Sequence, residues 1–273
     1  MAEQRALAID YGPQGEIIIL FPDGSRDHTN LVPSDDERRK FEAFFGTTVG
    51  RSLLMENHER AANDGLTKLL RAQPARSSIE QTFERLSTIQ FDGVVSVIML
   101  DLDDFRLVNK LHGGNPAGDQ VLVWFADILK KCIRLGDVLA RWGGDEFLIL
   151  AAASKREEGQ SQRERDQPYS MTARVQTGAT LPNIQQPFGN GKMIAERIHA
   201  AMKKNPCFVD EKLIPQTATI GVANAYIKPG FDPETLFDDL LRHSNHALYQ
   251  GKMSGKRDEI HVAPMIHSKP KSL

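Results

Sequence analysis

The chain contains few of the features that define secreted, membrane-spanning or nucleic-acid-binding proteins. It has two cysteines in 273 residues, Cys132 and Cys207, and their positions exclude a disulfide framework and a cysteine metal site. Its 34 basic and 36 acidic residues leave a net charge of -2, which does not favour nucleic acid or a membrane surface as main partner. Its longest apolar runs, such as VVSVIML, are too short to cross a bilayer.

The two ends of the sequence carry no recognisable targeting signal. MAEQRALAID lacks the charged-then-apolar order of a signal peptide, and KPKSL is not a peroxisomal signal. We therefore expect a cytoplasmic protein. A hydrophobic share of 40% is sufficient for a sizeable core, in one large domain or in one ordinary domain with a small one.

Apolar periodicity alternates between strand and helix patterns along most of the chain. Strands are expected around residues 94–102, 138–142, 147–150 and 216–226, and helices around residues 77–86, 119–133, 193–202 and 233–253. The strands at 138–142 and 147–150 form an antiparallel hairpin. This order predicts an α+β fold, with a mixed β-sheet flanked by helices.

A small region precedes this pattern. Residues 6–11 and 16–21 predict a hairpin, and Ser34 and Glu37 have the spacing of a helix capping box. A composition change at Asn63-Asp64-Gly65 divides a hairpin and helical region, residues 1–62, from a main domain, residues 63–264. The helical part carries six apolar residues that could pack on the hairpin: Phe41, Phe44, Phe45, Val49, Leu53 and Leu54.

Two segments lack a periodic pattern. Residues 154–191 are polar and charged, and ordered connections longer than about 15 residues are uncommon, so we expect a mobile surface insertion there. Residues 265–273 are expected to form a disordered tail.

Two groups of acidic residues follow strand patterns. Asp101 and Asp103 end a buried strand and face the same way, although acids at a strand end are commonly just solvated. Gly143-Gly144-Asp145-Glu146 stands at the expected hairpin tip. If that hairpin pairs beside the first strand, the carboxylates cluster and favour Mg²⁺ or Mn²⁺. Glycines in a two-residue turn would supply positive φ and let a triphosphate approach closely.

These residues belong to a series of motifs that resembles the GGDEF family of diguanylate cyclases. The series runs in order from about Asp64 to Val262, and chance agreement of so many blocks is not plausible. The matching blocks are Asp64-Gly65-Leu66-Thr67, LDLDDFRLVN, Gly118-Asp119, WGGDEF, TIGVA and ALYQGKMSGK.

The resemblance implies a palm-like fold, two GTP substrates, two divalent metals (Mg²⁺ or Mn²⁺) per active site, and the product cyclic di-GMP. It assigns metal binding to Asp101, to the carbonyl of Leu102, and to Asp145 and Glu146. Asp145 would also accept the proton of the ribose 3′-hydroxyl. Two metals would lower the pKa of that hydroxyl and offset the charge on the α-phosphate.

The resemblance assigns guanine recognition to Asn109 and Asp119, with Phe105 also in the substrate site. An ionised Asp119 can accept from both donors on the edge of guanine, whereas adenine lacks the amino group. On its own, Asp119 also fits the N-cap of the following helix.

Three basic residues fall at phosphate-binding positions of the family. Lys252 and Lys256 match a basic pair, although cations near a helix C-terminus also interact with the helix dipole. Arg106 stands where the family usually has lysine, and it would stabilise phosphate charge with a different geometry.

The resemblance also implies a regulatory site and a homodimer. Arg134 and Asp137 form an R-x-x-D at the family's product-inhibition position, and Arg197 resembles a second arginine of that site. Such pairs also commonly link surface turns. Because the product is two-fold symmetric and one domain holds one GTP, two chains must face each other. Residues 34–63 lie where the family carries a dimerising or signal-transmitting helix, so their apolar residues could form a dimer contact instead of packing on the hairpin.

The sequence departs from the family pattern in places. The segment between Asn109 and Asp119 is one residue longer than usual, and Ser244-Asn245 replaces an acid-containing pair. The alternative function is a weakly active or inactive domain that binds cyclic di-GMP or GTP as a sensor. The intact acids at 145 and 146 argue against it.

Overall fold

The structure is a computed structural model that describes residues 7–13, 16–21, 26–28, 33–111, 114–134, 136–154 and 191–268. The described residues form two compact units, which divide between Asn63 and Asp64. The expected insertion at residues 154–191 lies almost entirely outside the described residues. Within the described ranges, no helix combines the length and apolarity needed to cross a membrane.

The first unit contains a small antiparallel sheet and two helices. The sheet has the order β1 (Ala8–Tyr11), β2 (Ile17–Leu20), β3 (Arg26–His28), and the helices are α1 (Asp35–Phe45) and α2 (Thr48–Ala62). The hairpin of β1 and β2 is the expected one. The third strand was not expected, because its sequence, RDH, carries no apolar alternation.

The capping box at the start of α1 is present. Glu37 N donates to Ser34 Oγ, and Ser34 N donates to Glu37 Oε2 at 2.9 Å. Thr47 caps α2, because its side chain accepts a hydrogen bond from Gly50 N at 2.9 Å. At the interruption between the helices, the C-cap of α1, Gly46, is followed directly by the N-cap of α2.

The apolar residues of α1 and α2 include a packed group and an exposed group. Phe41 and Leu54 pack against the buried β2 residues Ile17 and Ile19 and the adjacent Phe21, which is the local-packing alternative. Three others are exposed, by 42%, 65% and 44% of their surface: Phe44, Val49 and Leu53.

The second unit is built on a mixed sheet with the strand order β11-β10-β5-β7-β6-β4, and β12 also pairs with β10. Its strands are β4 (Leu70–Arg71), β5 (Gly93–Leu102), β6 (Val138–Arg141), β7 (Glu146–Ser154), β10 (Ala218–Ile227), β11 (Ile260–Val262) and β12 (Ile266–His267). β10, β5, β7 and β6 are antiparallel neighbours, whereas β4, β11 and β12 pair in parallel, which confirms the predicted α+β class.

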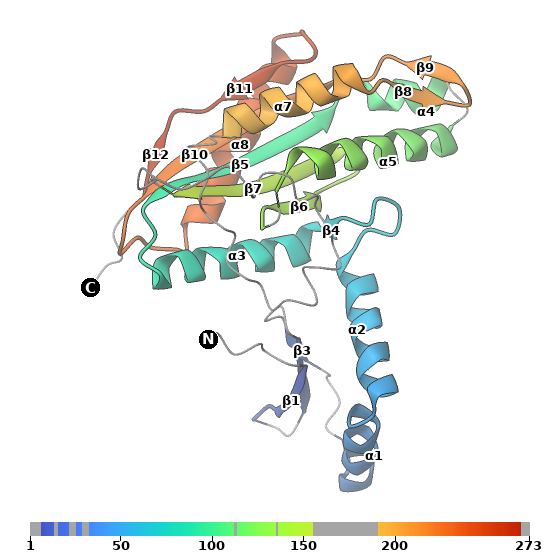
Figure 1. The fold of residues 1–273 in the computed structure, drawn as a ribbon, viewed down its shortest axis with the longest axis vertical. Helices are drawn as coiled ribbons and strands as arrows, with labels where there is room; N and C mark the ends of the chain where they lie inside the picture. The colour runs from blue at the N-terminus through green and yellow to red at the C-terminus, as the bar shows by residue number, and fades with distance from the viewer. Residues whose placement is uncertain are drawn as a thin grey trace, which may run out of the picture. The chain divides into compact units, whose positions relative to one another are not determined.

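Helices cover both faces of this sheet (Figure 1). Ile98 and Leu100 of β5 pack with α5 (Asn115–Cys132) and α7 (Gly191–Lys204), whereas Val97 and Met99 pack with α3 (Ala72–Thr88) and α8 (Leu236–Met253). A short helix, α4 (Phe105–Leu111), follows β5, and a small hairpin of β8 (Cys207–Val209) and β9 (Lys212–Ile214) follows α7. Residues buried on both faces explain why β5 reads as a continuous apolar run.

The glycine turn differs from the prediction. β6 ends at Arg141 and β7 begins at Glu146, so four residues connect the strands instead of two. Neither Gly143 nor Gly144 has a positive φ, so the longer turn closes without left-handed backbone. A Cβ on Gly143 would lie 2.8 Å from Glu146 Oε2, whereas one on Gly144 would meet nothing within 4 Å. The missing side chain of Gly143 therefore leaves room for the Glu146 carboxylate, whereas Gly144 faces open space at the tip of the turn.

The predicted disordered tail does not begin at residue 265. Ile266–His267 form β12, which pairs in parallel with Ala225–Tyr226, and Ser268 N donates to Tyr226 O at 3.2 Å. Ile266 also packs against the core, and this apolar contact orders the segment. Residues 269–273 lie outside the described residues.

Candidate active site at the end of strands β5 and β7

The acids that end β5 and begin β7 lie next to each other. Asp101 and Glu146 are direct partners in the antiparallel register, so their side chains leave the same face of the sheet. Asp145 immediately precedes Glu146, and its carbonyl accepts from Leu102 N at 3.4 Å. The sheet therefore brings together the two acidic groups that the sequence places 44 residues apart, from Asp101 to Asp145.

The acids disturb one another electrostatically. Burial raises the pKa of Glu146, and repulsion from Asp101 and Asp145 raises it further. Burial also raises the pKa of Asp101, an effect that Lys252 opposes and Asp145 reinforces. These carboxylates carry negative charge that a cation in their midst would stabilise.

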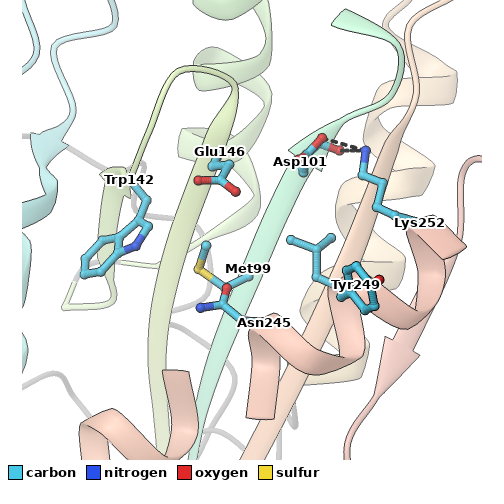
Figure 2. Close-up of a pocket in the computed structure, with 8 residues that line it drawn as sticks. Met99, Asp101, Trp142, Glu146, Asn245, Tyr249 and Lys252 are labelled. Carbon is cyan, nitrogen blue, oxygen red and sulfur yellow. Dashed lines mark hydrogen bonds and ion pairs between the residues drawn. The ribbon is translucent and has the colours of Figure 1, made fainter. Parts of the chain in front are cut away.

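Lys252 of α8 supplies one positive charge at this point. Its Nζ lies 2.6 Å from Asp101 Oδ1 and 2.9 Å from Asp103 Oδ1, so both acids of the strand end face the same ammonium. Figure 2 shows Lys252 reaching from α8 towards Asp101, with Glu146 on the neighbouring strand. A cavity of about 320 Å³ lies here, lined by Met99, Asp101, Trp142, Glu146, Asn245, Leu248, Tyr249 and Lys252.

The donor atoms fit a hard divalent cation. In the part of the chain that the structure describes, no three acidic, histidine or cysteine side chains converge into a ready-made metal cage. Asp101 and Glu146 nevertheless offer carboxylate oxygens from paired positions on neighbouring strands. The backbone carbonyl of Leu102, the residue after Asp101, is a further oxygen donor. Hard oxygen donors suit Mg²⁺ and Mn²⁺. Such an ion would also relieve the charge repulsion that adds to burial in raising the pKa values of Asp101 and Glu146.

A second feature lies between α4 and α5. Asn109 Oδ1 is buried and has no hydrogen-bond partner among the described residues. A Cβ at Gly118 would lie 2.1 Å from this oxygen and 2.9 Å from Phe105 Cζ. Glycine at 118 therefore lets the Asn109 amide and the Phe105 ring approach the backbone of α5 closely. The described protein atoms leave this buried acceptor unsatisfied, and a donor group on a ligand would satisfy it.

Asp119 is not a helix cap. Helix α5 begins at Asn115, with Gly114 as its N-cap at φ 79°, so Asp119 lies in the second turn and is exposed. The predicted start at Gly118-Asp119 was wrong, because Gly114 and Pro116 begin the helix earlier. The capping alternative for Asp119 is thereby removed, and its side chain lies free on the helix surface next to Gly118.

Comparison with known proteins identifies the family. The family model described as "Diguanylate cyclase, GGDEF domain" matches residues 61–189. The chain is 30% identical over 271 residues to the diguanylate cyclase DgcP of Escherichia coli, a match covering 92% of this chain and 67% of that protein. The chain belongs to the GGDEF family of diguanylate cyclases.

Other relatives of this GGDEF chain are longer proteins. Diguanylate cyclase A of Treponema denticola is 28% identical over 177 residues, which are 63% of this chain and 38% of that protein. Diguanylate cyclase DgcP of Pseudomonas aeruginosa is 26% identical over 212 residues, which are 78% of this chain and 25% of that protein. The chain thus spans between a quarter and two fifths of these two relatives.

Solved structures agree on the fold. The coiled coil and GGDEF domain of DgcB from Caulobacter crescentus, in complex with c-di-GMP, superposes with a TM-score of 0.56 at 17% identity, covering 84% of this chain and all of that one. Diguanylate cyclase SiaD of Pseudomonas aeruginosa, with its activator SiaC, gives a TM-score of 0.54 at 23% identity and covers 84% of this chain and 71% of that one. The α+β GGDEF fold is therefore shown.

Two predicted basic residues of the GGDEF domain stay apart from the acids. Lys256 follows the end of α8, its side chain is 77% exposed, and it pairs with Glu259 at 3.8 Å. Arg106 lies exposed on α4 and makes no hydrogen bond or ion pair with the described residues. Of the three predicted phosphate ligands, the structure brings only Lys252 to the carboxylates.

The R-x-x-D residues contact each other. Arg134 N and Nε donate to the Asp137 carboxylate at 3.1 and 3.4 Å, and Arg134 also donates to the Ala152 carbonyl. Burial raises the pKa of Asp137, and the charges of Arg134 and Arg197 oppose this rise. The three predicted residues of the inhibitory site therefore lie within electrostatic reach of one another.

Sequence reasoning missed the role of Arg141 and placed Asp103 at the strand end without its partners. Arg141 pairs with Asp64 at 3.1 Å and donates from Nη2 to the Gly144 carbonyl at 2.7 Å, so it ties the acidic turn to the opening motif. Asp103 is buried, and although burial acts to raise its pKa, hydrogen bonds hold that pKa below 3.8. Both residues stand inside motifs, but their partners are too distant in sequence to be predicted.

Proposed function

We propose that this chain is a diguanylate cyclase, which joins two GTP molecules into cyclic di-GMP and releases two pyrophosphates. Membership of the GGDEF family supports the reaction class. The observation that carries the proposal is the direct pairing of Asp101 with Glu146, with Lys252 Nζ 2.6 Å from Asp101. Opposed carboxylates beside a cationic side chain suit metal-assisted phosphoryl transfer.

The space between α4 and α5 would hold the guanine base. Asn109 Oδ1, which has no hydrogen-bond partner among the described residues, offers a buried acceptor, and Phe105 lies beside it. Asp119, one residue beyond Gly118, would accept from N1–H and the 2-amino group. A site of this kind rejects adenine, because a carboxylate would be left without donors.

In the proposed reaction, the ribose 3′-oxygen of one GTP bonds to the α-phosphorus of the other, and the bond to the β-phosphate oxygen breaks. Asp145 accepts the proton of the hydroxyl, and Lys252 stabilises negative charge on the phosphates. A divalent cation held by Asp101, Leu102, Asp145 and Glu146 would lower the pKa of the hydroxyl and neutralise phosphate charge. Pyrophosphate leaves in line with the attack.

Two chains are needed, because each active site holds one GTP and each hydroxyl attacks the nucleotide of the other. This geometry fits an isologous homodimer. The exposed residues Phe44, Val49 and Leu53 offer an apolar contact for it.

The cluster of Arg134, Asp137 and Arg197 supports product inhibition by cyclic di-GMP. Arginine donates bidentately to guanine O6 and N7, and a carboxylate accepts from the opposite edge. Arg134 already has its guanidinium beside the Asp137 carboxylate, at an Nε–Oδ1 distance of 3.4 Å.

The test is to incubate the purified chain with GTP and Mg²⁺ and to separate the nucleotides. We expect cyclic di-GMP and pyrophosphate, abolished in Asp145→Ala and retained in Asp127→Ala, whose carboxylate lies on the surface of α5. Tight GTP or cyclic di-GMP binding without any turnover would instead support the sensor function.

A second measurement tests the cation without turnover. Mg²⁺ should raise the melting temperature of the wild-type chain, because a ligand that binds only the folded state stabilises it. Asp101→Asn should lose most of this rise. An equal rise in the variant would remove Asp101 from the cation site.

A further inference from the structure

The two acids at the end of β5 have different environments. The side chain of Asp101 is 23% exposed, and its carboxylate contacts Lys252. The side chain of Asp103 is 2% exposed, and each of its carboxylate oxygens accepts two hydrogen bonds. An ionised carboxylate has about four acceptor positions, so Asp103 is fully satisfied and has none left for a metal or a substrate.

The donors to Asp103 come from three separate parts of the domain. Thr219 Oγ1 and Lys252 Nζ donate to Oδ1 at 2.7 and 2.9 Å. Thr217 Oγ1 and the backbone N–H of Asp258 donate to Oδ2 at 2.7 and 3.0 Å. Asp103 therefore joins the start of β10, the end of α8 and the segment after α8 at one point.

The backbone of Asp103 is fixed as well. Its N–H donates to the Thr217 carbonyl at 2.9 Å, and its carbonyl accepts from Gln216 Nε2 at 2.7 Å. With backbone and carboxylate both held, Asp103 has a single orientation. A residue held in this way can impose an orientation on the flexible Lys252 side chain that its carboxylate contacts.

We propose that Asp103 is a positioning residue, which fixes the ammonium of Lys252 at the end of β5 so that its charge meets the nucleotide phosphates. This inference rests on the proposed function of Lys252 in the same site. A lysine side chain has four rotatable carbon bonds and loses rotamer freedom when it is fixed. The contact with Asp103 already restricts the Lys252 side chain before the nucleotide binds.

The clean test is Asp103→Asn combined with Lys252→Met in a double-mutant cycle. Asparagine keeps the shape of aspartate but replaces one acceptor oxygen with an amide donor, and it removes one of the two carboxylate charges that contact Lys252 Nζ. We expect kcat/KM for GTP to fall by about 10- to 100-fold in Asp103→Asn, as misplacement of a positioned group does.

Coupling distinguishes positioning from a general structural defect. If Asp103 acts through Lys252, the double variant has the same kcat/KM for GTP as Lys252→Met alone. The double variant should likewise bind a non-hydrolysable GTP analogue as tightly as Lys252→Met does. Losses that multiply across the two substitutions would overturn the inference. Asp104→Asn is the matched control, because Asp104 pairs with Arg257 on the surface and should retain nearly wild-type values.

The outcome remains decisive if Asp103→Asn does not fold. Thr219→Val removes the donor that shares Oδ1 with Lys252, preserves the side-chain shape, and enters the same cycle. A wild-type chain that neither binds nor converts GTP would refute the proposed function itself. A wild-type chain that converts GTP, with independent losses in both cycles, would refute only the role of Asp103.

Discussion

Arg141 pairs with Asp64, 77 residues earlier in the chain, at an Nη1–Oδ2 distance of 3.1 Å. Asp64 also accepts from the backbone and hydroxyl of Thr67, at 2.7 and 2.8 Å. The same guanidinium donates to the Gly144 carbonyl from Nε and Nη2. The opening motif of the domain therefore supports the turn that carries Asp145.

Arg141→Lys should destabilise the turn and slow the reaction. A single ammonium cannot reproduce a planar fork that bonds the Asp64 carboxylate and the Gly144 carbonyl together. We expect unfolding free energy to fall by about 1–2 kcal/mol, as for a lost charged hydrogen bond, and kcat to fall with it. Urea unfolding and turnover measure both. Arg76→Lys, at a surface pair with Asp238, should change kcat little, and an equal kcat in Arg141→Lys would contradict the prediction.

Asp64 should make folding stability depend on pH. Burial acts to raise its pKa, but the hydrogen bonds from Thr67 and Arg141 outweigh burial and hold the pKa below 3.8. The stabilisation is therefore fully present above pH 3.8 and is lost as the pH falls through the folded-state value. Asp64→Asn should be less stable than wild type at pH 7. The difference in unfolding free energy between the two proteins should narrow below pH 3.8. If thermal unfolding shows the same stability difference between the two proteins at every pH, the hydrogen-bonded Asp64 carboxylate is not the source of the pH dependence.

Asp119 should set the choice of base. Wild type should convert inosine triphosphate, which lacks the 2-amino group, less efficiently than GTP, and ATP least of all. Asp119→Asn should lower kcat/KM for GTP by about 10²-fold or more, because an amide offers donors where guanine also has donors. Steady-state kinetics with the three nucleotides provide the measurement, and Asp127→Asn on the same helix serves as control. Unchanged selectivity in Asp119→Asn would assign guanine recognition elsewhere.

Arg134 should control product inhibition without taking part in turnover. In Arg134→Ala, the inhibition constant for cyclic di-GMP should rise by about tenfold or more, as for the loss of a bidentate contact to guanine. The uninhibited rate should stay near wild type. Arg242→Ala, which removes a surface pair with Asp239, is the matched control. An inhibition constant that does not change in Arg134→Ala would refute the site.

The exposed apolar residues of α1 and α2 should support dimer formation. Val49 is 65% exposed, and Val49→Asp would place a charge in an apolar contact. We expect the sedimentation coefficient to shift towards the monomer and specific activity to fall at low protein concentration. Ser52→Asp adds the same charge to an exposed polar position of α2 and should leave the dimer intact. Equal sedimentation of the two variants would place the dimer contact elsewhere.

The sequence predicts part of the centre of the site, because side-chain alternation in β5 and the hairpin of β6 and β7 follow from local patterns. That Asp101 lies opposite Glu146 requires in addition that β7 pairs beside β5, which no local pattern specifies and the structure shows. The metal-binding roles of these acids come from the family resemblance alone and are part of the proposed function.

Other features depend on contacts that no local pattern contains. The donors to Asp103 lie at positions 217, 219, 252 and 258, more than 100 residues away, so its burial and fixed orientation were unpredictable. The turn at Gly143-Gly144 was misjudged because two glycines also fit a shorter connection. The start of α5 was misplaced because Gly118-Asp119 imitates a capping pair, whereas the actual cap, Gly114, offers no side chain.

Because residue 118 has no side chain, Asn109 Oδ1 lies 2.1 Å from the position that a Cβ there would occupy. A methyl group at this position would therefore displace Asn109 and Phe105, the residues proposed to contact the purine, and would leave the arginine cluster around Asp137 unchanged. Under the proposed function, Gly118→Ala would abolish synthesis of cyclic di-GMP and retain its binding, so that the two activities become separable within a single polypeptide.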